Sequence, residues 1–194
     1  MSLQFHDVPA IDVESGLLRY AREVPSPNHD ERPPETVADL IVVHGISLPP
    51  DEFGGPWIDA LFTNTLPPDR HPYFATIADR RVSSHLLIRR DGEIVQYVPF
   101  HRRAWHAGVS AYRGREKCND FSIGIELEGE DEHAYESEQY GALSVVIAAL
   151  CAAYPLLSRE RIAGHSDIAP GRKTDPGPAF DWPRLSALLR IRDR

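Results

Sequence analysis

The sequence predicts a single domain of the mixed α/β class, and three segments carry that prediction. Residues 40–43 are a short apolar run with β-branched side chains, which is typical of a buried strand. Residues 82–100 contain two extended runs around an Asp-Gly turn and predict a hairpin. Residues 137–153 place their apolar side chains on one helical stripe. We divide the chain into an N-terminal arm, residues 1–35, and a main part of the same domain, residues 36–194.

Composition excludes several classes of protein. The chain has 194 residues, 42% of them hydrophobic, and carries a net charge of −8. Nucleic acid is not an expected partner, because contacts with phosphates need a basic face. No apolar run approaches the roughly 20 residues that span a bilayer, and the N-terminus has neither the basic nor the apolar region of a secretory signal. We therefore expect a cytoplasmic monomer that binds no membrane, and its two cysteines fit reduced thiols better than a disulfide.

The N-terminal arm is rich in proline and charge, and within it only residues 16–24 look extended. We expect this arm to wrap the surface of the protein. Its contribution to the core should be limited to Leu17, Leu18 and Tyr20.

The predicted strand at residues 40–43 runs directly into His44 and Gly45. Ligand sites in open α/β sheets lie beyond the carboxyl ends of strands, so His44 is a candidate metal ligand. The alternative is a buried histidine with satisfied hydrogen bonds. A long loop, residues 46–56, follows, and a short helix should then run to about Leu66, with one more helical turn near residues 74–78.

The predicted hairpin pairs residues 84–89 with residues 93–98. Trp105 and His106 follow it, beside small residues that suggest the wall of a pocket. Simple packing is the alternative for this pair.

A second strand, residues 121–129, places Gly124, Glu126 and Glu128 on one face. A glutamate inside an apolar strand is costly unless it is paired or takes part in chemistry, and Glu126 is the more interior of the two. Gly124 would let another group approach that face closely. The alternative is an edge strand with a solvated polar face.

The long helix should begin with Ser137 as its N-cap and form part of the core. Its apolar stripe comprises Tyr140, Leu143, Ile147, Leu150, Cys151 and Tyr154. A short strand at residues 161–163 and a last helix at residues 182–191, capped by Asp181, complete the prediction.

The segment from Gly164 to Asp175 contains a histidine, a lysine and an aspartate among prolines and glycines. Proline lacks the amide donor and restricts the residue before it, so we expect a loop with a fixed course and no helix. His165 and Asp175 are both good Zn²⁺ ligands, and catalytic zinc usually takes three protein ligands and a water molecule. His44 is the candidate for the third.

These residues would supply the parts of a metal-assisted amide hydrolysis. Zn²⁺ held by His44, His165 and Asp175 would lower the pKa of a bound water molecule and polarise a carbonyl. Glu126 would transfer the proton of that water to the leaving amine. Lys173 would stabilise the oxyanion, where one such donor is worth roughly 3 kcal/mol.

Long motifs in the same order resemble the type 2 N-acetylmuramoyl-L-alanine amidases of the peptidoglycan-recognition superfamily, over about residues 24–189. They are VVHGISLPPDEFGGPWIDALF, IRRDGEIVQYVPF, RRAWHAGVS, CNDFSIGIELEG and GHSDIAPGRKTDPGPAFDW. The resemblance implies a central mixed β-sheet flanked by α-helices, with a zinc site at one end of the sheet. It assigns the zinc ligands to His44, His165 and Asp175, and the catalytic roles to Glu126 and Lys173.

The resemblance also implies a substrate, a muropeptide whose lactyl–L-alanine amide bond is cleaved during cytoplasmic recycling of cell-wall fragments. It places Arg81, Trp105 and Lys117 in the substrate groove. Two positions depart from the family pattern. Gly45 stands where we expect asparagine, so a hydrogen bond to the substrate is either lost or supplied by the backbone. Lys117 stands where we expect arginine, which keeps the charge but removes the bidentate fork. Arg81, Lys117 and Arg172 suit the carboxylates of a stem peptide on an otherwise acidic protein.

Two other functions remain open from the sequence. One is an amidase that acts on polymeric peptidoglycan, and the other is a peptidoglycan-binding module without activity. The complete set of three metal ligands with Glu126 and Lys173 favours an enzyme over a binding module.

Overall fold

A computed structural model describes residues 11–191 of the chain. Its centre is a six-stranded sheet with the order β12-β5-β11-β6-β7-β3. The strands of this sheet are β3 (Arg22–Glu23), β5 (Leu40–Ile46), β6 (Leu86–Ile88), β7 (Ile94–Gln96), β11 (Ser122–Glu128) and β12 (Ile162–Gly164). The helices are α1 (Trp57–Phe62), α2 (Pro72–Ala75), α3 (Ser137–Ala153), α4 (His165–Ile168) and α5 (Trp182–Ile191), with 3₁₀ turns η1 (Cys118–Asp120) and η2 (Arg159–Arg161).

The sheet is mixed, as predicted. Strands β12, β5, β11 and β6 run parallel to one another, β7 returns antiparallel to β6, and β3 lies parallel to β7. Three two-stranded pairs lie outside it: β1 (Ile11–Asp12) with β2 (Leu17–Leu18), β4 (His29–Asp30) with β8 (Arg103–Ala104), and β9 (Ala111–Tyr112) with β10 (Arg115–Glu116).

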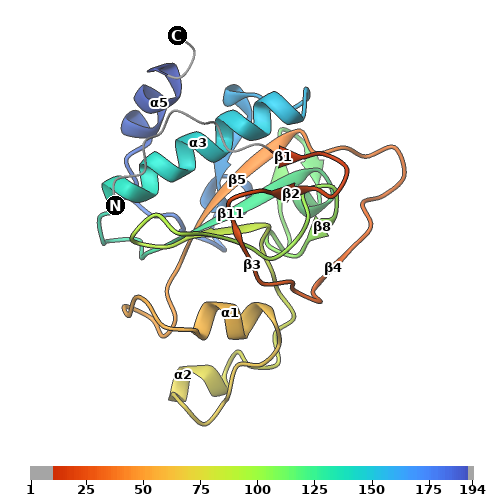
Figure 1. The fold of residues 1–194 in the computed structure, drawn as a ribbon. Coiled ribbons are helices and arrows are strands. Elements are labelled where there is room, and N and C mark those ends of the chain that lie inside the picture. Colours follow the sequence, from red (N-terminus) through yellow and green to blue (C-terminus); the bar gives the residue numbers. More distant parts are fainter. Residues whose placement is uncertain (1–10, 192–194) are drawn as a thin grey trace.

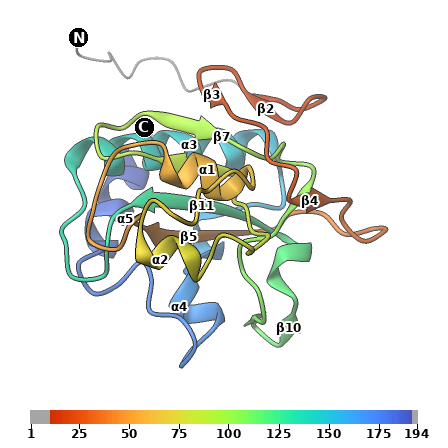
Figure 2. The ribbon, with the colours of Figure 1, turned by 90° about the horizontal axis from the view of Figure 1, so that it is seen from below.

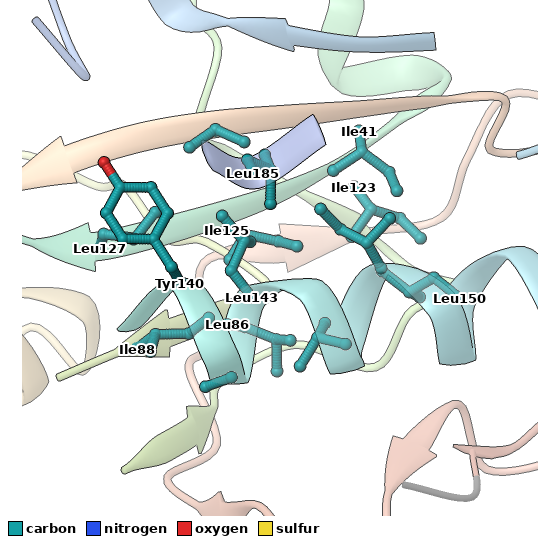
Figure 3. Packing of buried hydrophobic residues seen from close by; sticks show 14 of the residues in the cluster. Ile41, Leu86, Ile88, Ile123, Ile125, Leu127, Tyr140, Leu143, Leu150 and Leu185 are labelled. Atoms are coloured by element: carbon teal, nitrogen blue, oxygen red, sulfur yellow. The ribbon is translucent and has the colours of Figure 1, made fainter. Parts of the chain in front are cut away.

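Helices α3 and α5 cover one face of the sheet, above it in Figure 1. Figure 3 shows the packing of this layer, in which leucines and isoleucines of β5, β6 and β11 meet the apolar stripe of α3 and Leu185 of α5. The predicted stripe is confirmed, because its first four members are buried in this cluster and Cys151 and Tyr154 pack against it.

The opposite face of the sheet carries two smaller apolar clusters. One lies beneath α1 and α2, which Figure 2 shows on the side of the sheet away from α3, and it includes Leu87 and Val95. The other packs Leu40 and Val42 against Ala107 and neighbouring residues. Alternate residues of each strand therefore serve different layers, as the pleat requires.

The strand at residues 121–129 is central. β11 lies between β5 and β6, and all of its residues are buried. The edge-strand alternative is therefore wrong. The parallel neighbours β5 and β6 pair with both edges of the strand, and both of its glutamates are buried.

The N-terminal arm contributes more to the fold than expected. Its strand β3 joins the main sheet beside β7 and forms the edge strand. Leu18 is buried as predicted, but Tyr20 is 71% exposed, so its assignment to the core was wrong. Ser26 and Asn28 are buried as well, and their side chains bond to backbone carbonyls of the main part, including Phe62 O. Polar residues can thus be interior when the backbone supplies their partners.

Three local predictions need correction. The helix predicted to reach Leu66 ends at Phe62, and Ser137 is the first residue of α3, whose N-cap is Glu136. The amide of Glu136 donates to Gln139 Oε1 at 3.0 Å, which closes the N-terminus of that helix. The segment predicted to lack helix begins with the single turn α4, because the restriction from Pro170 acts on Ala169 and leaves residues 165–168 unaffected.

Candidate metal centre and active site

The predicted catalytic side chains meet in one cavity of about 360 Å³. It is lined by six of the eight predicted site residues, which are His44, Trp105, Glu126, His165, Lys173 and Asp175. These residues are spread along the sequence from His44 to Asp175. The fold, and no local motif, therefore assembles the site.

The sheet register brings the first three groups together. His44 of β5 is the register partner of Glu126 of β11, so both side chains leave the same face on adjacent strands. Gly164, the last residue of β12, pairs with Val43, and His165 therefore begins α4 beside His44. The functional groups lie toward the carboxyl ends of parallel strands, where α/β sheets bind their ligands.

Asp175 is fixed to α4 through the backbone. The amide of Ser166 donates to Asp175 O at 2.9 Å, which holds the carboxylate beside the His165 ring. Lys173 lies on the same turn, and its amide donates to Ala169 O at 3.0 Å. The proline- and glycine-rich stretch thus closes on itself and presents Lys173 and Asp175 to one cavity.

His44, His165 and Asp175 form a group that could hold a metal ion. The Nδ1 atoms of the two histidines lie 2.9 Å apart, and Asp175 Oδ2 lies 3.3 Å from the first and 3.0 Å from the second. Ligands at zinc bond lengths of about 2.0–2.1 Å in a tetrahedron lie about 3.3 Å from each other. Two imidazole nitrogens and one carboxylate oxygen, close to that spacing and open to the cavity, therefore fit a catalytic zinc site.

The electrostatics of this group favour a bound cation. Burial lowers the pKa of His44 to about 4, so its imidazole is neutral at pH 7 and offers a lone pair. Burial alone would raise the pKa of the Asp175 carboxyl, but its close contacts with the His165 and His44 rings outweigh burial and hold that pKa far below its usual range. A deprotonated carboxylate and a neutral imidazole are the states that bind metals.

Glu126 is set apart from the other acidic groups of the site. Burial, and after it the charge of Asp175, raise the pKa of its carboxyl to about 8 against the opposing charge of Lys173. Its Oε1 lies 4.0 Å from His44 Nδ1. A carboxyl whose pKa lies near neutrality can both accept and return a proton, which is the requirement for general acid–base catalysis.

Glu128 is buried more deeply than Glu126, with 2% against 8% exposure, contrary to the order expected from the sequence. Its carboxylate accepts from Gly54 N at 2.6 Å and pairs with Arg89 at 3.5 Å. The Glu128 charge is thus compensated within the protein, and of these two glutamates Glu126 is the one that lines the cavity.

The predicted substrate-binding residues are distributed unevenly. Trp105 lines the cavity, whereas Arg81 and Lys117 are exposed and do not. Arg80, which the sequence gave no reason to prefer over its neighbour, lines the cavity instead, and so does Glu130. A strand pattern could not have found these two, because both lie in irregular segments.

Gly45 lines the cavity beside His44, and Tyr135 occupies the space where a side chain of residue 45 would begin. A Cβ atom at this position would lie 2.3 Å from the Tyr135 hydroxyl, which donates to Pro176 O at 2.9 Å. A side chain there would therefore meet Tyr135 before it could reach a substrate. Glycine in place of the expected asparagine at position 45 therefore affects the packing of Tyr135 and Pro176 beside Asp175.

The fold and this site define an amidase. The sequence model of the N-acetylmuramoyl-L-alanine amidases matches residues 33–178, and the chain belongs to this family. Helices long and apolar enough to cross a membrane are absent from residues 11–191.

Within the family, the chain is similar to proteins named 1,6-anhydro-N-acetylmuramyl-L-alanine amidase AmpD. It is 64% identical to that of Salmonella typhimurium over 178 residues, covering 92% of this chain and 95% of the relative. It is also 64% identical to that of Escherichia coli K12 over 177 residues, covering 91% and 96%.

Solved structures agree with this relationship. A crystal structure of a selenomethionine AmpD derivative superposes with a TM-score of 0.89 at 63% identity, covering 92% of this chain and 98% of the other. The amidase AmiD of Escherichia coli, in complex with the substrate anhydro-N-acetylmuramic acid-L-Ala-D-γ-Glu-L-Lys, gives a TM-score of 0.57 at 33% identity, covering 78% and 57%.

Proposed function

We propose that this protein is a zinc-dependent amidase that hydrolyses the bond between the lactyl group of 1,6-anhydro-N-acetylmuramic acid and L-alanine. The observation that carries the proposal is the convergence of two histidine nitrogens and the Asp175 carboxylate beside Glu126 in one cavity. The names of the relatives support the anhydro-sugar as the substrate.

His44, His165 and Asp175 would hold the zinc ion. Bound there, the ion would activate a water molecule and polarise the amide carbonyl. Glu126 accepts the proton of the attacking water and delivers it to the nitrogen of the departing L-alanine. Its raised pKa supports both halves of this transfer, because a carboxyl with a pKa near the working pH can take up the proton and release it, whereas an ordinary glutamate stays ionised at neutral pH.

Lys173 stabilises the negative charge that develops on the carbonyl oxygen. Its position in the cavity wall supports this role. The neighbouring Arg172 holds the turn in place, since its guanidinium donates to Val109 O at 2.7 Å and to Ala107 O at 2.5 Å. A donor that is held in position before the reaction stabilises a transition state more than a mobile one.

The substrate-binding roles of Arg81, Trp105 and Lys117 remain part of the proposal. Trp105 in the cavity wall supports its role directly, and Arg80 would reinforce the cationic surface for a stem-peptide carboxylate. Arg81 and Lys117, outside the cavity wall, would contact only a substrate long enough to extend beyond it.

We further propose that residues 1–35 and 36–194 form one domain, with residues 1–10 outside the described part. The pairing of β3 with β7 supports this. A cytoplasmic monomer that recycles cell-wall fragments is the setting we propose.

The test of this function compares two substrates. The purified protein, assayed for zinc by mass spectrometry, is incubated with anhydro-N-acetylmuramyl-tripeptide and separately with intact sacculi, and released peptide is measured. We expect rapid release from the small substrate and slow release from sacculi. Release from sacculi alone would identify an amidase of polymeric wall, and no release from either, with zinc bound, would identify a binding module.

A further inference from the structure

The two histidines that face the metal position must each carry their ring proton on the distant nitrogen. A neutral imidazole has one N–H and one lone pair, and only the lone pair binds a metal. The Nδ1 atoms of His44 and His165 are the ones that converge with Asp175 Oδ2. Both rings therefore have to be held as the Nε2–H tautomer.

A chain of three hydrogen bonds fixes the tautomer of His44, and its direction is set at the far end. The carbonyl of Cys118 can only accept, and Ser122 Oγ lies 2.6 Å from it, so the hydroxyl donates there. Ser122 Oγ must then accept from His106 Nε2–H at 3.1 Å. His106 Nδ1 is left with a lone pair, which accepts from His44 Nε2–H at 2.9 Å.

The residue after His106 performs the same task for His165. The carbonyl of Ala107 lies 3.2 Å from His165 Nε2 and can only accept, so that nitrogen carries the proton. The guanidinium of Arg172 donates to the same carbonyl at 2.5 Å, which its second lone pair allows. The guanidinium of Arg172 also lies 3.4 Å from His165 Nε2, and this longer contact is the weaker of the two that Arg172 makes here.

The His106 ring reaches this position because residue 124 has no side chain. A Cβ atom on Gly124 would lie 2.5 Å from His106 Cγ. The backbone of His106 and Ala107 is held from the other side by Asn119 Oδ1, which accepts from their amides at 3.1 and 2.7 Å.

We propose that His106, with Ser122 behind it, is a positioning residue that sets the tautomer of His44 and thereby prepares its Nδ1 for the metal. This inference rests on the proposed metal site but concerns residues that do not contact the metal. Outer groups that orient a ligating histidine typically change metal affinity 10–100-fold when they are removed.

The first experiment reads the tautomer directly in metal-free protein. Long-range ¹⁵N–¹H NMR at pH 7.5 in chelator should show His44 as the Nε2–H form in the unsubstituted protein. His106→Leu removes the acceptor and should give a mixture of both forms at His44. His106→Asn keeps an acceptor near the place of Nδ1 and should restore the Nε2–H form.

Ser122→Ala covers the case in which His106→Leu fails to fold, because it removes a single oxygen atom. Its matched control is Ser26→Ala, whose buried hydroxyl likewise donates to a backbone carbonyl, Phe62 O, but lies outside the relay. Ser122→Ala should disturb the His44 tautomer and Ser26→Ala should not. A pure Nε2–H form of His44 in both Ser122→Ala and His106→Leu, or in Ser122→Ala alone if His106→Leu is unfolded, would overturn the proposal.

Zinc affinity gives a second readout that separates this proposal from the function. We expect the zinc Kd, measured by competition with a chromogenic chelator, to rise 10–100-fold in His106→Leu and to stay within threefold of the starting value in His106→Asn and Ser26→Ala. Absence of zinc binding in the unsubstituted protein would contradict the proposed cofactor and leave the tautomer result standing. Tight binding that His106→Leu does not weaken would contradict the relay alone.

Discussion

At the residue scale, two chemically identical groups in the candidate site differ because their surroundings differ. Glu126 and Glu128 lie two positions apart on one strand face, yet the carboxylate of Glu128 pairs with Arg89 and the carboxyl of Glu126 faces the cavity with a pKa of about 8. The sequence identified both glutamates but ranked their burial in the wrong order, because the partners of Glu128 come from segments far along the chain.

Asp175 carries the negative charge of the metal group, and its removal should abolish metal binding. Asp175→Ala leaves two histidine nitrogens, which are one ligand short of a catalytic zinc site. We expect zinc content below one tenth of an equivalent, measured by mass spectrometry after dialysis, and loss of amidase activity. Full zinc occupancy in this variant would show that the ligand assignment is wrong.

Glu126→Gln should separate metal binding from turnover. The amide fills the same volume but cannot take up a proton, so we expect kcat to fall by 10²–10⁴-fold while zinc content stays at one equivalent. Glu128→Gln is not a neutral control, since Glu128 pairs with Arg89, so Glu138→Gln on the exposed start of α3 serves instead. A rate within tenfold of the starting enzyme would remove Glu126 from its proposed role.

At the scale of elements, the sequence predicted the strands and helices that have a periodic hydrophobic pattern. It missed the contacts that join segments far apart in the chain. The strands β5 and β11, the hairpin β6–β7 and the helices α3 and α5 follow from hydrophobic period and turn residues, and each was found. Gly124 was correctly expected to admit a close neighbour, although the sequence did not show that this neighbour is the His106 ring. The extended stretch at residues 16–24 was expected on the surface, and the sequence did not show that its strand β3 joins the main sheet, because two exposed residues carry no apolar pattern.

The segment that follows β8 is held by one side chain of η1, and its loss should be measurable. Asn119 Oδ1 accepts from the amides of His106 and Ala107, and Asn119→Ala leaves both donors without this partner. A buried donor without a partner costs roughly 1–3 kcal/mol, so we expect the free energy of unfolding in urea to fall by about that amount or more. Asn64→Ala, which removes the two reciprocal hydrogen bonds between the side chains of Asn64 and Asn28, provides the comparison. An Asn119→Ala protein as stable as the parent would show that water replaces the side chain.

At the scale of the whole molecule, buried neutral histidines make stability depend on pH. Burial, together with the charge of Arg32, lowers the pKa of His85 to about 3, against about 6.5 in an unfolded chain. Between these values the unfolded state binds a proton and the folded state does not, so folding loses stability as pH falls below about 6.5. The slope approaches about 1.4 kcal/mol per pH unit for each such histidine.

His85→Asn should reduce that slope by the contribution of one histidine. The amide oxygen can still accept from Gly124 N, as His85 Nδ1 does at 3.0 Å, but it does not titrate. Urea unfolding in chelator at pH 7, 6 and 5 should give a shallower fall for the variant than for the parent. The exposed His133, replaced in the same way, should leave the slope unchanged. Equal slopes in the parent and His85→Asn would mean that folding does not lower the pKa of His85.

The pairing of His44 with Glu126 across β5 and β11 has a consequence for how this catalyst can change over evolutionary time. Neighbouring strands stand about 4.8 Å apart whatever side chains they carry, so the spacing between metal ligand and proton carrier belongs to the backbone ladder. Substitutions around the cavity can alter which substrates enter without moving these two groups. A single inserted or deleted residue within either strand, in contrast, turns its functional side chain to the opposite face, toward α3. Evolution of this chain can therefore substitute residues around the cavity, but it cannot insert or delete residues within β5 or β11 without losing the pairing of these two groups.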